Sequence, residues 1–186
     1  LVASWRLPTA FYWTFVSLPL LHMLPTGVVF AALVPAHAAI FGSYCESAGF
    51  FDVAGLAVGL AGVALQAVAD EQLRIYRRLP EPRPGAFGEG VADVGVWRYS
   101  RHPNYFGEIL HWLSYVLFAV GAGALEAPHT CKCLLGWLPV PVLFVAASVP
   151  LMEKRQVSHK AGYRRYQQVV SVLVPLPRFS GEQKDV

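Results

Sequence analysis

Long stretches without a single charged residue constrain this chain more than any other feature of its sequence. Leu7–Cys45 contains no Asp, Glu, Lys or Arg over 39 residues, and 53–69 and 133–152 are equally uncharged over 17 and 20 residues. A helix crosses the roughly 30 Å of a bilayer's hydrocarbon core with about 20 apolar residues. Charged residues make up only 15% of the chain, whereas soluble domains carry about a quarter. The sequence therefore predicts an integral membrane protein.

The uncharged runs divide into about five membrane passes. As one helix, Leu7–Cys45 would be about 58 Å long, which is too long for a single crossing. Its four prolines favour interruptions, so this run is predicted to make two passes. The five predicted passes are Thr9–Leu24, Thr26–Ile40, Phe51–Ala69, Ile109–Leu125 and Leu134–Met152. The expected fold class is all-α, a polytopic transmembrane helical bundle.

The chain after the last pass is predicted to lie at the membrane surface. In 158–172, apolar and tyrosine side chains recur at helical spacing opposite lysine and arginine, which is typical of an interfacial helix. Pro175 ends this helix, and residues 180–186 are expected to form a disordered tail. Residues 1–179 would then form one transmembrane domain.

Lysine and arginine gather in two blocks. Of the 15 basic residues, six lie in 74–101 and seven in 154–184. The positive-inside bias predicts that both blocks lie on the cytoplasmic side or its organellar equivalent, with an even number of passes between them. The expected location is the endoplasmic reticulum, another organelle or a bacterial inner membrane. Although the net charge is +3, this clustering at membrane boundaries argues against a nucleic-acid partner.

No metal site is predicted. Three cysteines cannot build a disulfide framework, and two of them, Cys131 and Cys133, follow His129 in the turn between the last two passes. Zinc would need a fourth ligand and usually a wider spacing. We therefore interpret this cluster as an ordinary loop.

The segment Trp97–Glu108 carries the densest polar chemistry of the chain. Pro103 suits the first turn of a helix, where its missing N–H is not needed. Such a helix places Asn104, Glu108, His111 and Tyr115 on one face. Polar side chains on a membrane helix are energetically costly, so this stripe is expected to face a cavity or a ligand.

Three polar clusters are predicted to meet at one membrane face. The first is Asp70/Arg74/Arg77, the second is Trp97–Glu108, and the third is Glu153 with the tyrosine- and arginine-rich helix that follows. Arginine matches phosphate oxygens through its planar fork, carboxylates accept hydroxyl protons, and aromatic rings stack on flat ligands. Anchoring to lipid headgroups is the alternative, and it accounts for the arginines and aromatics better than for the carboxylates.

Three motifs in the same order resemble the steroid 5-alpha-reductase C-terminal-like membrane proteins. These proteins form a superfamily with sterol reductases and isoprenylcysteine carboxyl methyltransferases. The resemblance runs from about Asp52 to Pro177, and its motifs are Ala69–Leu73, Gly95–Glu108 and the tract from Glu153 through Gly162–Tyr166. It implies a bundle of membrane helices whose cytosolic end binds NADPH.

The resemblance also implies roles for individual residues. In the reductase branch, the positions that match Asp70, Arg77, Asn104 and Glu108 contribute to the NADPH site. No residue is matched to a catalytic acid: the reductases carry such groups on early helices, and this chain is expected to begin after most of them. Taken with the polar clusters, the predicted cofactor-binding residues are Asp70, Arg74, Arg77, Trp97, Tyr99, Arg101, His102, Asn104, Tyr105, Glu108, Glu153, Arg155, Tyr163 and Tyr166.

Three functions remain open at this point. The leading hypothesis is an NADPH-dependent oxidoreductase that reduces a C=C bond of a sterol, enone or other lipid. The second is a methyltransferase that uses S-adenosylmethionine, because Arg101-His102-Pro103-x-Tyr105 is shared with that branch. The third is a non-catalytic structural or lipid-binding subunit of a membrane complex. Membrane lipids, a lipid-like substrate and, for the third hypothesis, other membrane subunits are the expected partners.

Overall fold

The computed structural model describes residues 11–41, 48–80, 86–88, 90–123 and 129–178. In these residues the regular structure is helical, and the only β pairing is an isolated bridge between Ser100 and Ser171. The all-α bundle predicted from the sequence is confirmed. The expected tail, 180–186, lies outside the described residues.

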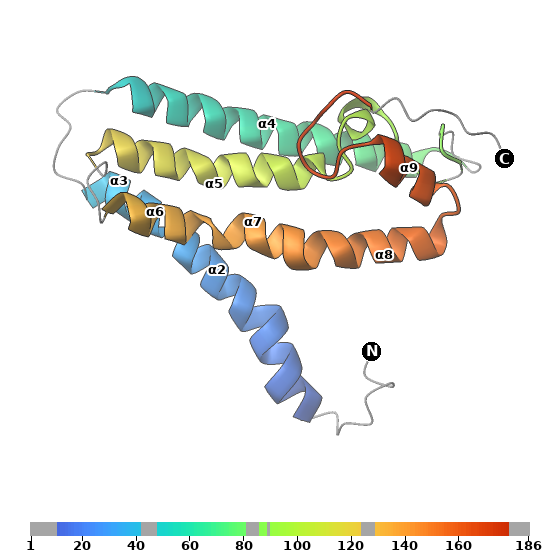
Figure 1. Ribbon diagram of the computed structural model, residues 1–186, viewed down its shortest axis with the longest axis horizontal. Helices are drawn as coiled ribbons and strands as arrows, with labels where there is room; N and C mark the ends of the chain where they lie inside the picture. Colours follow the sequence, from blue (N-terminus) through green and yellow to red (C-terminus); the bar gives the residue numbers. More distant parts are fainter. Residues whose placement is uncertain (1–10, 42–47, 81–85, 89, 124–128, 179–186) are drawn as a thin grey trace.

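Long helical rods build the molecule (Figure 1). The first rod joins η2 (Tyr12–Met23), α2 (Leu24–Ala32) and α3 (Val34–Phe41), the second is α4 (Phe50–Arg78), and the third is α5 (Pro103–Gly121). The fourth joins α6 (His129–Trp137), α7 (Pro139–Leu143), η4 (Phe144–Ser148) and α8 (Val149–His159). Two short helices, η3 (Gly95–Arg98) and α9 (Tyr163–Val169), complete the described fold.

Three of these rods are long and apolar enough to cross a membrane. Their spans are Trp13–Phe41, Phe50–Arg78 and Cys131–His159, each of 29 residues. The prediction of an integral membrane protein is thereby supported. The second and fourth rods extend beyond the predicted passes at their polar ends. The loop expected at His129 is instead the first turn of α6.

The division of the N-terminal run into two passes is wrong, because the structure has one continuous rod there. The three prolines of this run that lie in the described residues do not terminate the helix. Pro25 and Pro35 lie in the first turns of α2 and α3, where a missing N–H costs little, and Pro19 lies inside the π-helical segment η2. Local widening to π geometry lets a membrane helix pass a proline without ending.

Glycines bring α4 and α5 into contact at backbone distance. A methyl carbon on Gly62 would lie 2.6 Å from the Gly107 carbonyl oxygen, and one on Gly107 would lie 2.6 Å from the Gly62 carbonyl oxygen. Nearby, Gly55 faces the ring of Phe118. Small residues at helical spacing allow membrane helices to approach at backbone distance, and here they align α4 against α5 along their length.

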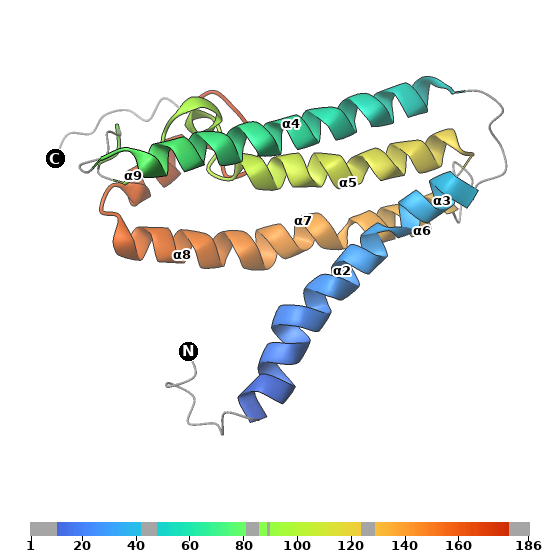
Figure 2. The same ribbon diagram turned by 180° about the vertical axis from the view of Figure 1, so that it is seen from behind.

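The first rod leaves the bundle at an angle (Figures 1 and 2). It packs through α3 against α5 and α6, and through Ala32 against Ile109 and Val140. Farther toward its N-terminus, large side chains such as Phe15 and Phe30 are 65% and 76% exposed. In a membrane this half of the rod contacts lipid.

The polar segments gather at one end of the bundle, which we call the basic end. The last turns of α4 and α8, the first turn of α5, and α9 all lie there (Figure 1). The interfacial helix expected over 158–172 is shorter than predicted, because α8 continues to His159 and α9 covers only Tyr163–Val169. We call the opposite end, where α3 and the first turn of α4 lie, the far end.

Candidate functional site: a polar pocket at the basic end

A cavity of about 790 Å³ opens at the basic end. Segments that are far apart in the sequence line it: the end of α4, the loop before α5, the first turn of α5, the end of α8, and α9. The lining residues are Asp70, Leu73, Tyr76, Arg77, Gly90, Ala92, Trp97, Arg101, His102, Asn104, Tyr105, Met152, Arg155, Gln156, His159, Lys160, Tyr163 and Tyr166. Ligand pockets usually have volumes of about 300–1,000 Å³, so this one has room for a nucleotide-sized molecule.

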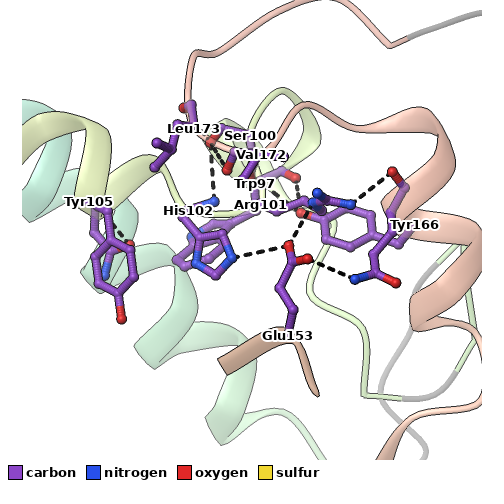
Figure 3. A network of polar contacts seen from close by, with 11 residues as sticks. Trp97, Ser100, Arg101, His102, Tyr105, Glu153, Tyr166, Val172 and Leu173 are labelled. Atoms are coloured by element: carbon purple, nitrogen blue, oxygen red, sulfur yellow. Dashed lines mark hydrogen bonds and ion pairs between the residues drawn. The ribbon is translucent and has the colours of Figure 1, made fainter. Parts of the chain in front are cut away.

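A half-buried carboxylate, with 14% of its side chain exposed, holds the pocket wall together (Figure 3). One oxygen of Glu153, Oε1, lies 2.9 Å from Arg101 Nε and 3.3 Å from His102 Nε2. The other, Oε2, accepts a 2.8 Å hydrogen bond from Gln167 Nε2. Arg101 and His102 are 7% and 6% exposed, so the Arg101–Glu153 ion pair is little screened by water. We call these four residues the Glu153 cluster, and it joins α5, α8 and α9.

Stacked rings continue the wall from the Glu153 cluster toward the fourth rod. The rings of His102 and Tyr105 are nearly parallel, with centroids 5.2 Å apart. The Tyr105 ring in turn stacks on Phe144, with centroids 4.6 Å apart. Tyr105 is thus fixed between two rings that cover both of its faces, so it can meet a ligand only through its ring edge and hydroxyl.

Two buried side chains fix the loop before α5. Trp97 donates its indole N–H to the Ala69 carbonyl oxygen at 2.8 Å, and the Tyr166 hydroxyl donates to the Trp97 carbonyl. Burial raises the pKa of both Tyr166 and Tyr163 well above the usual value of a phenol, and the negative charge of Glu153 adds to the rise at Tyr163. Both phenols therefore remain protonated and can donate hydrogen bonds at neutral pH.

The fully buried Ser100 anchors the chain on both sides of the pocket. Its hydroxyl donates to the Leu173 carbonyl at 2.6 Å and accepts the His102 N–H at 3.1 Å. Beside it, the Arg101 N–H donates to the Ser171 carbonyl at 2.8 Å. These bonds hold the segment after α9 against the start of α5.

Replacement of Ser100 by alanine should lower the free energy of unfolding by about 1–3 kcal/mol, because a part-buried carbonyl and a helix-start N–H both lose their partner. Thermal unfolding of the purified protein would measure this loss. The matched control is Ser158→Ala, since Ser158 is exposed and bonds only within its own helix turn and to the adjacent His159. Equal effects of the two variants would contradict the anchoring role.

Polar side chains with access to solvent form the mouth of the pocket. Asn104 donates its side-chain N–H to Asp70 Oδ1 at 3.2 Å, which connects α5 to α4. Arg77, Arg155 and Lys160 lie on the same lining. The mouth thus offers one carboxylate that can accept hydroxyl protons and several cations that can bind anionic groups.

The structure brings together ten of the fourteen predicted cofactor-binding residues as lining of this pocket: Asp70, Arg77, Trp97, Arg101, His102, Asn104, Tyr105, Arg155, Tyr163 and Tyr166. Glu153 stands behind the lining and supports Arg101 and His102. The other three predicted residues, Arg74, Tyr99 and Glu108, are not part of the lining.

Local partners explain why these three residues are elsewhere. Arg74 pairs with Glu71 on the exposed side of α4. Tyr99 follows the turn η3 and is 49% exposed. Glu108 Oε1 accepts a 2.8 Å hydrogen bond from the indole of Trp112, one turn farther along α5. The predicted polar stripe of α5 is therefore divided, with only Asn104 in the pocket.

Eight lining residues were not predicted, and helical spacing could have found most of them. Leu73 and Tyr76 lie three and six positions after Asp70, on the face that also carries Arg77. In the fourth rod, Met152, Arg155, Gln156 and His159 follow the i, i+3, i+4, i+7 pattern of one helix face. Gly90 and Ala92 come from the loop, where the sequence has no periodic signal.

The fold and this pocket define a polytopic α-helical membrane protein with a ligand-sized polar cavity at one end. The chain belongs to the family described as Protein of unknown function (DUF1295), which matches residues 6–170. A similar curated protein is an uncharacterized protein of Schizosaccharomyces pombe, 27% identical over 179 residues. The match covers 89% of this chain and 50% of the yeast protein, so the chain spans about half the length of that relative. No solved structure matches the chain.

Proposed function

We propose that this protein is an NADPH-dependent membrane reductase that acts on a C=C bond of a sterol, enone or other lipid. The pocket at the basic end would hold the cofactor, and the resemblance of its three motifs to the steroid 5-alpha-reductase-like proteins supports this assignment. When bound, NADPH supplies a hydride to an activated double bond. The residues of this chain bind and orient it.

The charge of the pocket lining is the observation that carries the proposal. Four permanent cations, Arg77, Arg101, Arg155 and Lys160, and one carboxylate, Asp70, lie on it. Even with Glu153 neutralising Arg101 and with Lys160 left out of the count, the two cations Arg77 and Arg155 outnumber the single carboxylate Asp70. NADPH carries several negative phosphate charges, whereas S-adenosylmethionine carries a sulfonium, an ammonium and one carboxylate group and is positive overall. The lining therefore favours the reductase over the methyltransferase.

Each part of the lining suits one part of the dinucleotide. Arg77, Arg155 and Lys160 at the mouth suit the phosphates, and Arg77 and Arg155 can bind phosphate oxygens in pairs. The Asp70 carboxylate suits a ribose hydroxyl. The Tyr105 hydroxyl, held in place by the rings on either side, suits a hydrogen bond to the base or nicotinamide.

Titration of NADPH into the protein in nanodiscs, followed by nicotinamide fluorescence, tests this proposal. Arg77→Ala should weaken binding roughly tenfold, since a charge-assisted hydrogen bond contributes about 1.5–3 kcal/mol. Arg74→Ala is the matched control, because Arg74 lies one turn earlier on α4, outside the lining and paired with Glu71. It should bind NADPH as the unmodified protein does.

Calorimetry with S-adenosylmethionine separates the alternatives. A clear heat of binding with S-adenosylmethionine and none with NADPH would overturn the reductase in favour of methyl transfer. Binding of neither cofactor would favour a non-catalytic subunit. We further propose that the basic end faces the cytoplasm or its organellar equivalent, where both basic blocks and the cofactor pool would lie.

A further inference from the structure

The chain after α9 forms a non-helical strap, residues 170–178, that runs back over the start of α5 (Figure 1). Between Gln168 and Arg178 the sequence has no charged or amide side chain, and valine, leucine and proline fill the strap together with a single serine. The helix before it is different, since Arg164 and Arg165 of α9 are exposed. The strap is therefore an apolar segment in a tract of the chain where basic residues predominate.

Leu173 brings the strap to the depth of the membrane spans. Its side chain packs against the buried cluster that contains Ile109 and Val140. Val140 lies in the fourth rod, 8 residues after Lys132 and 13 residues before Glu153. At 1.5 Å per residue, these two charged residues are about 12 Å and 20 Å away along the helix. The cluster, and with it the Leu173 side chain, therefore lies at the level of the hydrocarbon.

The inner side of the strap is bonded to the segment that leads into α5 (Figure 3). The Ser171 carbonyl accepts the Arg101 N–H at 2.8 Å. The Leu173 carbonyl accepts the Ser100 hydroxyl at 2.6 Å. Where water is scarce, irregular backbone is stable only if the protein supplies partners of this kind.

The second half of the strap has few N–H groups that need a partner. Pro175 and Pro177 have none, because the proline ring replaces the amide hydrogen. The Leu176 N–H, between them, donates to the Tyr99 carbonyl at 3.0 Å. This half of the strap can therefore approach lipid without leaving an amide hydrogen unpaired.

The outer side of the strap presents aliphatic side chains. Val172, Val174 and Leu176 are exposed, whereas the residues between them are less exposed. Water covers aliphatic surface at a cost that grows with its area, and acyl chains cover it without that cost. One side of the strap is thus held by the protein, and the other suits lipid.

From these contacts we infer that the strap inserts into the acyl layer of the leaflet at the basic end, where its three outward side chains contact lipid chains. Arg178 returns the chain to the polar loop before α5. Its guanidinium lies 3.2 Å from Asp93 Oδ2 and 5.2 Å from the centre of the Phe87 ring. The inference holds whatever the basic-end pocket binds, so it is independent of the proposed function.

Fluorescence quenching at position 174 tests this insertion. Val174→Cys is introduced into a chain whose three cysteines are replaced by alanine, labelled with an NBD fluorophore and placed in phosphatidylcholine nanodiscs. We expect strong quenching by phosphatidylcholine that carries a nitroxide on its acyl chain, and several-fold weaker quenching by aqueous iodide than at Arg165→Cys of α9. Leu60→Cys, exposed within the α4 span, is the lipid-facing control.

Two outcomes of the quenching experiment overturn the inference. Iodide quenching at position 174 as strong as at Arg165→Cys places the strap in water. Quenching by neither agent shows that another protein surface, such as a second copy of the chain, covers the strap.

A second measurement keeps the natural cysteines. Val174 is exposed within the protein, so aspartate at this position meets no clash and is nearly neutral if the strap lies in water. In lipid the added charge is costly, and Val174→Asp should lower the thermal midpoint in nanodiscs by roughly 5 °C or more. Val174→Thr, which keeps the shape without the charge, is the matched control and should change the midpoint little. Equal midpoints for the two variants overturn the inference.

Discussion

Replacement of Gly62 by alanine should destabilise the protein by about 3 kcal/mol, the upper end of the range for a carbon inserted into a closely packed core. The added methyl would lie 2.6 Å from the Gly107 carbonyl oxygen and 2.8 Å from the His111 backbone nitrogen. Both are backbone atoms, so α4 and α5 must move apart to accommodate it. Thermal or denaturant unfolding of the purified protein would measure the change.

The control for this substitution is Gly27→Ala in α2. A methyl on Gly27 would meet nothing within 4 Å. Alanine is favoured over glycine within a helix by about 1 kcal/mol, so this variant should be neutral or more stable. The two substitutions are chemically identical and are expected to differ in sign. A stable Gly62→Ala variant would mean that α4 and α5 are not in backbone contact at this point.

Replacement of Glu153 by alanine should have an effect of similar or greater size, about 3–5 kcal/mol, because it leaves Arg101 buried without its counter-charge. Arg101 is 7% exposed and has no other carboxylate partner among the described ion pairs. The loss should also loosen the pocket, since His102 and Gln167 both contact the same carboxylate. Unfolding measurements give the first effect, and proteolysis near α9 gives the second.

Glu153→Gln separates charge from hydrogen bonding in this cluster. The amide oxygen can still accept from Gln167, while the ion pair with Arg101 is lost, so an intermediate loss of stability is expected. Glu71→Ala is the surface control, because the Glu71–Arg74 pair is exposed and should contribute little. If Glu153→Ala were no more destabilising than Glu71→Ala, the Glu153 cluster would not hold the wall of the pocket.

The sequence predicted the helical class and the passes Phe51–Ala69 and Leu134–Met152 because hydrophobic length is a direct physical requirement of the bilayer. The predicted pass Ile109–Leu125 falls on α5, which is not among the three helices of the described residues that are long and apolar enough to cross a membrane. The prediction failed where prolines were taken as helix ends. Pro25 and Pro35 begin helical segments in the same rod, and Pro19 lies in a π-helical segment, so a rule drawn from soluble helix interiors divided one rod into two. Whether a proline ended the helix depended on its position within the helical segment and on the local helix geometry.

The pocket was predictable as a meeting of polar clusters but not in its detail. Arg77, Asn104 and Tyr163 reach one cavity because uncompensated polar groups gather at the membrane boundary. Glu108 shares a helix face with Asn104, yet it accepts a bond from Trp112 instead. Helical spacing gives the face on which a side chain lies, whereas competition between nearby partners decides where its oxygen points.

The distribution of the lining along the chain has a consequence for biosynthesis. Asp70 and Trp97 leave the ribosome early, whereas Tyr163 and Tyr166 emerge only after the fourth rod is complete. A nascent chain that ends before Glu153 lacks the carboxylate between Arg101 and His102, and these groups must then find water or lipid phosphate. The cavity is therefore among the last features to form during translation, and C-terminal truncation removes it even when three rods have already been inserted.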